Sequence, residues 1–519
     1  MFFPAKKLPY FAVVNPLKKL LGQTAVYGVS TVLGRALNFL LVPFYTAVFL
    51  PEEYGIVSYL YTYVAFFNII YLFGMETAYF RYGLKHGEEK AYQQAITVIL
   101  LIASIFTVVL FGFSDQIAIS LNIAGKADYI VMLALLMGVD AIAAIPLARL
   151  RYLNKAKKFA IVRIVNIFVN IGLNLFFLVL SRDIYNGDYL NGLRDIVLLY
   201  YNPDFGIGYV FLSNLLANIL FFPMLWRSFA AIRLRWYSEL APKMLKYAGP
   251  LVIVGSAGMF NELIDRILLM EWLPEDRYPD KSNEAVVGIY SACYKLSIFI
   301  TLVIQAFRFA AEPFFFNQSK EQDSRKTFAD VLKWFTIFTG LMVVTISLFR
   351  EPLGQLILRN DAYREGLFIV PVLLMANAFL GMYYNLTVWY KLSDKTMMGG
   401  VISVIGALLT LGFNILLIPV LGYAGSALTT LIAYFAMAVI SYLLGRKYYP
   451  IPYQIGRISA YLLLVSLISA VSYFSWFTTI GWGVAAVEGL LILIYIAVVY
   501  YVERKELPAK LRIFHKFTS

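Results

Sequence analysis

The chain alternates long apolar runs with short polar connections. A run of about 20 apolar residues crosses the hydrocarbon core of a bilayer as a helix. On this basis the pattern predicts an all-α polytopic membrane protein with about 14 transmembrane helices. The expected spans are 22–49, 55–84, 92–112, 128–150, 160–181, 205–226, 247–271, 285–316, 330–350, 364–390, 397–420, 424–445, 457–476 and 481–503.

The order of the spans predicts an internal repeat. The first six and the next six have similar lengths and begin on the same side of the membrane, as in a parallel repeat. We therefore expect two parallel six-helix lobes, residues 1–230 and 231–446, and a C-terminal helix pair with a cytoplasmic tail, residues 447–519. The connections are too short for a separate soluble domain.

Residues at equivalent spans support the repeat. The fifth span contains Gly172-Leu173-Asn174-Leu175, and the eleventh contains Gly412-Phe413-Asn414-Ile415. Each is followed by a turn rich in glycine, at residues 206–208 and 422–425. Two such lobes around a central cavity are suited to alternating access.

Composition identifies lipid as the solvent of the chain. Hydrophobic residues make up 61% and charged residues only 14% of the sequence, too few to cover a water-exposed fold. The net charge of +13 would suggest nucleic acid in a soluble protein. Here 31 of the 44 Lys and Arg fall in every second connection or the termini, and 8 fall in the others. This bias predicts that both termini are cytoplasmic and removes the reason to expect a nucleic-acid partner.

Other chemistry finds little support in the sequence. The single cysteine, Cys293, excludes a disulfide within the chain. Metal-ligand spacing, a glycine-rich phosphate loop and paired catalytic acids are not found, so we expect no cofactor, no metal and no enzymatic activity. The first apolar run is too long for a cleavable signal peptide and is expected to remain as a span.

Three stretches resemble a known family. They are GRALNFLLVPFYTAVFLPEEYG at residues 34–55, AYFRY at 78–82 and GFNILLIPVLGYAGSALTTLIAY at 412–434. Together they resemble the polysaccharide biosynthesis proteins of the multidrug/oligosaccharidyl-lipid/polysaccharide exporter superfamily. The resemblance implies a flippase of the cell inner membrane, which moves a polyprenyl-pyrophosphate-linked oligosaccharide to the outer leaflet. O-antigen and lipid II flippases are the reference activities, and in the latter an extra helix pair forms a groove for the lipid tail.

Basic residues inside the expected spans are the candidate substrate site. Charges at this depth are costly and are usually functional. Arg35 and Lys295 lie about 13 and 10 residues into their spans, which is roughly 20 and 15 Å, and neither has an acid three or four positions away. With Arg266 they would form a cationic cavity for the diphosphate, because Arg offers a planar fork and Lys a point charge. The alternative is that each is neutralised by an acid across a helix contact.

Acids and aromatic residues at similar depth complete the candidate site. Asp140, Glu262 and Asp265 could carry a coupling ion, H⁺ or Na⁺, or relay charge. Glu262 and Arg266 are four residues apart, a spacing that also permits an ion pair on one helix face, and Asp140 could pair with a basic group on another helix. Tyr290 and Tyr294 could stack on sugar rings.

Two other functions remain open from the sequence. A cation-coupled drug or metabolite antiporter of the same superfamily would need an acidic cavity, which the three basic residues disfavour. A membrane glycan polymerase or ligase tends to need a large external loop, and the longest expected one has about 20 residues.

Overall fold

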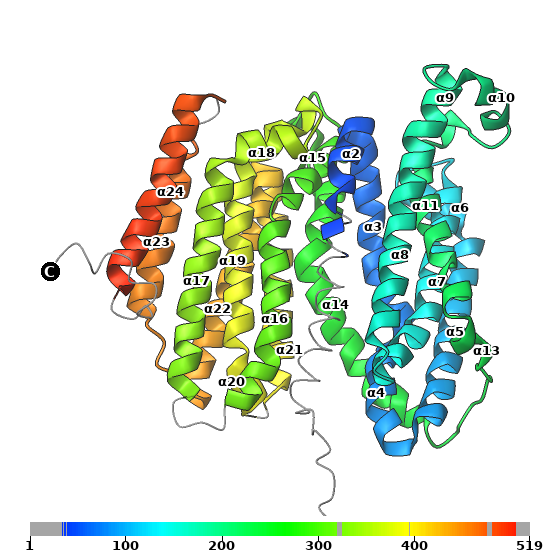
Figure 1. Cartoon of the computed structure of the whole chain (residues 1–519), viewed down its shortest axis with the longest axis horizontal. Helices are drawn as coiled ribbons and strands as arrows, with labels where there is room; N and C mark the ends of the chain where they lie inside the picture. The colour runs from blue at the N-terminus through cyan, green and yellow to red at the C-terminus, as the bar shows by residue number, and fades with distance from the viewer. Residues whose placement is uncertain are drawn as a thin grey trace, which may run out of the picture.

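The computed structural model describes Gly34, Ala36, Leu37 and residues 39–318, 324–393, 395–474 and 480–504, with the backbone alone for 309–314 and 316–318. Every regular element in these residues is helical, and most helices run along one direction (Figure 1). Nine are long and apolar enough to cross a membrane, or ten if the pair Asn283–Lys295 and Ile298–Arg308, bent by 51°, is one span. The predicted all-α membrane class is confirmed, whereas the number of 14 spans stays a prediction.

Each expected span overlaps a described helix or helix pair. In the first half of the chain these are α2 (Leu41–Val48), α3 (Pro51–Leu72) with α4 (Met75–His86), α5 (Glu88–Gly112), α7 (Ala127–Tyr152), α8 (Ala156–Leu175) with the π-helix η1 (Phe176–Ser181), and α11 (Gly208–Ile219) with α12 (Phe221–Met224). In the second half they are α14 (Ala241–Trp272), α15 (Asn283–Lys295) with α16 (Ile298–Gln318), α17 (Ser324–Leu348), α19 (Val370–Leu386) with α20 (Val388–Leu392), α21 (Met397–Leu421), α22 (Tyr423–Tyr448), α23 (Ile455–Val471) and α24 (Trp482–Glu503). Short helices in the connections are α6 (Ser114–Ser120), α9 (Arg182–Asn186), η2 (Asn191–Leu193), α10 (Arg194–Val197), η3 (Pro203–Phe205), α13 (Trp226–Ala230), η4 (Glu275–Arg277), α18 (Arg350–Ile357) and η5 (Asp361–Ile369).

The turns that the repeat argument singled out share a backbone conformation. Gly206 has φ 49° and ψ −119°, and Gly422 has φ 59° and ψ −138°, a region that only glycine adopts without strain. Asn174 and Asn414 are both buried, and each donates its amide N–H to the carbonyl four residues earlier, at 2.8 and 2.9 Å. These two pairs of positions therefore match in local structure as well as in sequence.

The two halves meet at the end of the bundle drawn uppermost in Figure 1, where α3 packs against α15. Gly55 and Gly288 face one another there. A Cβ added to Gly55 would lie 1.8 Å from the carbonyl oxygen of Glu284, and one added to Gly288 would lie 1.9 Å from that of Pro51. Only two glycines permit backbones to approach this closely, so this contact closes the upper end of the interface between the halves.

Hydrogen bonds near the contact of α3 with α15 also hold the two halves together at the upper end. The Tyr59 hydroxyl donates to the Glu271 carboxylate at 2.5 Å, joining α3 to α14. The buried hydroxyl of Tyr363, in η5, donates to the carbonyl of Phe49 at 2.9 Å. Each bond crosses from one half of the chain to the other, so separating the halves at this end would break both.

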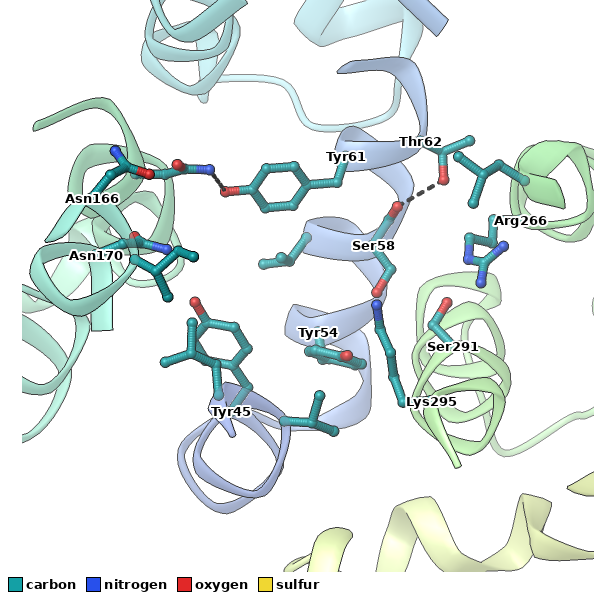
Figure 2. A pocket seen from close by; sticks show the side chains of 16 residues that line it. Tyr45, Tyr54, Ser58, Tyr61, Thr62, Asn166, Asn170, Arg266, Ser291 and Lys295 are labelled. Carbon is teal, nitrogen blue, oxygen red and sulfur yellow. Dashed lines mark hydrogen bonds between the residues drawn. The ribbon is translucent and has the colours of Figure 1, made fainter. Parts of the chain in front are cut away.

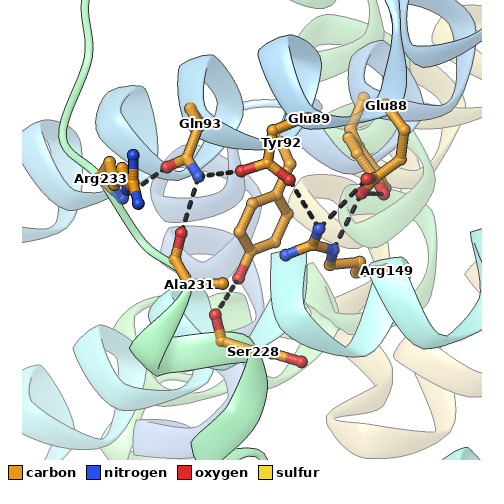
Figure 3. A network of polar contacts seen from close by, with 9 residues as sticks. Glu88, Glu89, Tyr92, Gln93, Arg149, Ser228, Ala231 and Arg233 are labelled. Carbon is orange, nitrogen blue, oxygen red and sulfur yellow. Dashed lines mark hydrogen bonds and ion pairs between the residues drawn. The ribbon is translucent and has the colours of Figure 1, made fainter.

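At the opposite, lower end, hydrogen bonds attach the segment that links α13 to α14 to the first half (Figure 3). Arg149, at the end of α7, pairs with Glu88 and Glu89 at the start of α5, at 2.9 and 2.8 Å. One turn further along α5, Gln93 accepts a hydrogen bond from the backbone N–H of Arg233 at 2.6 Å. The chain between α13 and α14 thus follows the first half before it enters α14.

The last two helices pack on α17 at the edge of the bundle (Figure 1). A buried ion pair joins Lys333 of α17 to Glu503 of α24 at 2.9 Å, and Tyr461 of α23 donates to the same carboxylate at 2.7 Å. The Tyr495 hydroxyl also donates to the carbonyl of Ile337 at 2.8 Å. Specific polar bonds, as well as apolar area, therefore attach α23 and α24 to the second half.

Candidate functional site

A cavity of about 340 Å³ lies between the two halves, directly below the closed upper end. Helices α2, α3, α8 and α11 of the first half line one wall, and α14 and α15 of the second half line the other. Figure 2 shows Arg266, Ser291 and Lys295 on one side of α3, with Asn166 and Asn170 on the other side. No Asp or Glu is among the described residues that line this cavity.

Two of the basic residues singled out from the sequence line this one cavity. Arg266 comes from the middle of α14, and Lys295 is the last residue of α15, where the chain bends into α16. Arg266 is only 5% exposed, and its guanidinium stacks on the Tyr294 ring at 4.8 Å. The third residue of that group, Arg35, lies outside the described residues.

The partner of Arg266 differs from the one that the four-residue spacing suggested. Its guanidinium pairs with Asp265 at 3.0 Å, and Glu262 contributes only its backbone carbonyl at 3.2 Å. The reason is burial: Asp265 is 3% exposed and needs a countercharge, whereas Glu262 is exposed. Arg266 therefore has a buried countercharge beside it, and neither Asp265 nor Glu262 lines the cavity.

Tyrosines other than the expected ones face the cavity. Tyr290 is fully buried, with its hydroxyl donating to Asp265, so it cannot stack on a ligand in this arrangement. Tyr45, Tyr54 and Tyr61 line the cavity instead, from α2 and α3. These rings supply the aromatic surface that the sequence placed on α15.

Asp140 has an amide hydrogen-bond partner, and the charge of the basic residue Arg163 also acts on it. It accepts a hydrogen bond from Asn218 at 2.9 Å, and Asn218 in turn accepts one from Asn166 at 2.8 Å. Asp140 does not line the cavity, but Asn166 does. A chain of side-chain hydrogen bonds therefore runs from Asp140 to the cavity wall.

Three asparagines contribute to this wall, and they were not among the residues predicted from the sequence. Asn166 and Asn170 of α8 and Asn214 of α11 line the cavity. The signal was present: Asn166, Asn170 and Asn174 recur every four residues, as do Asn214 and Asn218, within otherwise apolar helices. Side chains four apart share a helix face, and polar residues on one face of a spanning helix usually face the bundle interior.

A family model for polysaccharide biosynthesis proteins matches residues 20–319, which is more than half of the chain. The chain belongs to this family. No curated protein matches it.

Solved structures show that this family member has the fold of superfamily transporters. It resembles the lipid II flippase MurJ in an inward closed conformation, with a TM-score of 0.66 at 16% identity, over 92% of this chain and 99% of that chain. A multidrug resistance MATE family transporter gives a TM-score of 0.61 inward-facing (12% identity, 82% of this chain and 95% of that chain covered) and 0.58 outward-facing (13% identity, 85% and 96% covered). At these identities the likeness concerns the fold.

The cavity combines two kinds of chemistry. The second-half wall presents a guanidinium and an ammonium, which hydrogen-bond and attract anions. The first-half wall presents amides, hydroxyls and aromatic rings, which are neutral. A ligand with an anionic part and a polyhydroxylated part would satisfy both walls at once.

Proposed function

We propose that the protein is a flippase that moves a polyprenyl-pyrophosphate-linked oligosaccharide from the cytoplasmic to the outer leaflet of the inner membrane by alternating access. The observation that carries the proposal is the cavity between the two halves, with Arg266 and Lys295 on one wall and a neutral polar wall opposite. Family membership and the likeness to MurJ, a lipid II flippase, support it. In this proposal, residues 1–230 and 231–446 are the moving lobes.

A drug antiporter is the second candidate, because MATE transporters share the fold. Such a protein selects cationic ligands and needs acids in its cavity. The described lining holds two basic residues and no acid, which favours an anionic substrate. A coupling ion, H⁺ or Na⁺, remains compatible with either function.

Removing the guanidinium or the ammonium of the second-half wall is expected to lower glycan export strongly. Lys295→Gln removes the ammonium, and the double variant Asp265→Asn/Arg266→Gln removes the guanidinium together with its paired carboxylate, so that no buried charge is left unpaired. Each charge-assisted bond contributes about 1.5–3 kcal/mol, so each variant should lower export about 10- to 100-fold. The measurement is surface glycan, together with membrane abundance, in cells that lack their own copy.

The exposed Lys85→Gln serves as the matched control, because it removes a lysine charge far from the cavity. Normal glycan display by both cavity variants at normal abundance would exclude the flippase proposal. Increased sensitivity to cationic drugs upon loss of the protein, with unchanged surface glycan, would favour the antiporter.

The orientation proposed here places the upper end of the bundle outside the cell. Segments rich in Lys and Arg, such as the end of α7 and the start of α14, lie at the lower end (Figure 1). A cysteine at Gly192, in the upper connection, should therefore react with an impermeant maleimide in intact cells, whereas one at Lys157 should react only after permeabilisation. The reverse pattern would invert the proposed direction.

A further inference from the structure

The hydrogen bonds behind the first-half wall have a defined direction. Asp140 accepts from the amide N–H of Asn218 at 2.9 Å, so the Asn218 oxygen points the other way. That oxygen accepts from the Asn166 amide N–H at 2.8 Å. Since a carboxylate offers oxygens and no N–H, Asp140 fixes how both amides are turned. Asn166 consequently has its amide oxygen left for a ligand.

Two neighbouring bonds fix further groups on the same wall. Asn214 donates to the Tyr61 hydroxyl oxygen at 3.0 Å, which leaves the Tyr61 O–H proton as a donor. Asn174 donates to the Asn170 oxygen at 3.1 Å, which leaves the Asn170 N–H groups as donors. Asn166, Asn170 and Tyr61 all line the cavity (Figure 2). The wall therefore presents an oriented acceptor next to oriented donors.

We infer that this wall recognises the sugar next to the diphosphate, and that Asp140 is a positioning residue for it. The inference rests on the proposed function, because it assigns the neutral part of that substrate to the wall opposite Arg266 and Lys295. Asp140 does not touch the substrate. It acts through Asn218 and Asn166.

Hydrogen-bond chemistry is what selects a sugar here. A sugar hydroxyl both donates and accepts, so adjacent ring hydroxyls can pair with the Asn166 oxygen and the Tyr61 or Asn170 donors together. A doubly ionised phosphate only accepts and would leave the Asn166 oxygen unpaired. The Tyr45 and Tyr54 rings in the same cavity offer apolar faces for the C–H face of a sugar ring.

Binding of two lipids that differ only in the sugar tests the inference. The probes are polyprenyl diphosphate and the same lipid carrying one N-acetylhexosamine, with dissociation constants measured on the full-length protein by native mass spectrometry. Asn166→Ala and Asp140→Leu should each weaken binding of the sugar-bearing lipid about 3- to 10-fold, the value of one or two neutral hydrogen bonds. Binding of the sugar-free lipid should change less than about 2-fold.

Exchanging Asp140 and Asn218 distinguishes a positioning role of Asp140 from a role in folding. In Asp140→Asn/Asn218→Asp the carboxylate accepts from both amides, so Asn166 keeps its orientation, and sugar-lipid affinity should return to near the wild-type value. Equal weakening of both lipids by Asp140→Leu, or no rescue by the exchange, would overturn the positioning role.

The two proposals fail in different ways. If Lys295→Gln weakens both lipids while Asn166→Ala changes neither, the flippase proposal stands and the sugar wall does not. If the wild-type protein binds neither lipid, both proposals are wrong.

Discussion

Replacing Gly55 by alanine should drive the protein out of the arrangement that is closed at the upper end. The new Cβ would lie 1.8 Å from the carbonyl oxygen of Glu284, a separation that real Cβ atoms do not show. The neighbour is backbone, so no side chain can rotate away. Overpacking of this kind costs about 3 kcal/mol, and under alternating access the protein avoids that cost by populating the other state, a shift of roughly 100-fold.

Accessibility of the cavity measures this shift. Ser58 lines the cavity, so Ser58→Cys in a Cys293→Ala background provides a thiol whose reaction rate with an impermeant maleimide, added from the upper side, reports opening at that end. We expect the rate to rise 10- to 100-fold upon Gly55→Ala. Gly172→Ala is the control, because nothing lies within 4 Å of the added Cβ. An unchanged rate in the Gly55 variant would show that the glycine contact does not govern closure.

Apolar run length was enough to predict the all-α membrane class, because every spanning helix must satisfy its backbone within itself. It could not show where the helices deviate from straight rods. The chain bends by 51° after Lys295, and α3 is separated from α4 by Phe73 and Gly74, both left-handed. Such breaks depend on packing between helices, which run length does not record.

The candidate site could be predicted from the sequence only in part, for the same reason. Depth in the membrane marked Arg266 and Lys295 as residues that must avoid lipid, and both line the cavity. The four-residue spacing suggested Glu262 as the partner of Arg266, but the choice between Asp265 and Glu262 depends on which carboxylate is buried by neighbouring helices. The asparagines went unnoticed because uncharged amides cost less in a span than charges do.

Removing the Glu503 side chain should produce a large loss of stability. Glu503 and Lys333 are both fully buried and lie 2.9 Å apart, and Tyr461 also donates to the carboxylate. Glu503→Ala removes the carboxylate that lies 2.9 Å from the buried Lys333 ammonium, while Asp330, 3.9 Å away, remains. Breaking a buried pair from one side costs about 3–5 kcal/mol, so α24 should detach and the protein should aggregate at a lower temperature.

The double variant Lys333→Met/Glu503→Leu distinguishes loss of the pair from loss of packing. Replacing both charges by apolar side chains of similar size is often neutral or stabilising, so the double variant should survive heating in detergent as well as the wild type or better. The soluble fraction after a heating series measures this, with exposed Glu275→Ala as the control. If the single variant were as heat-resistant as the wild type, the ion pair would not hold α24 on α17. If the double variant were as unstable as the single one, the charges themselves would be required at that contact.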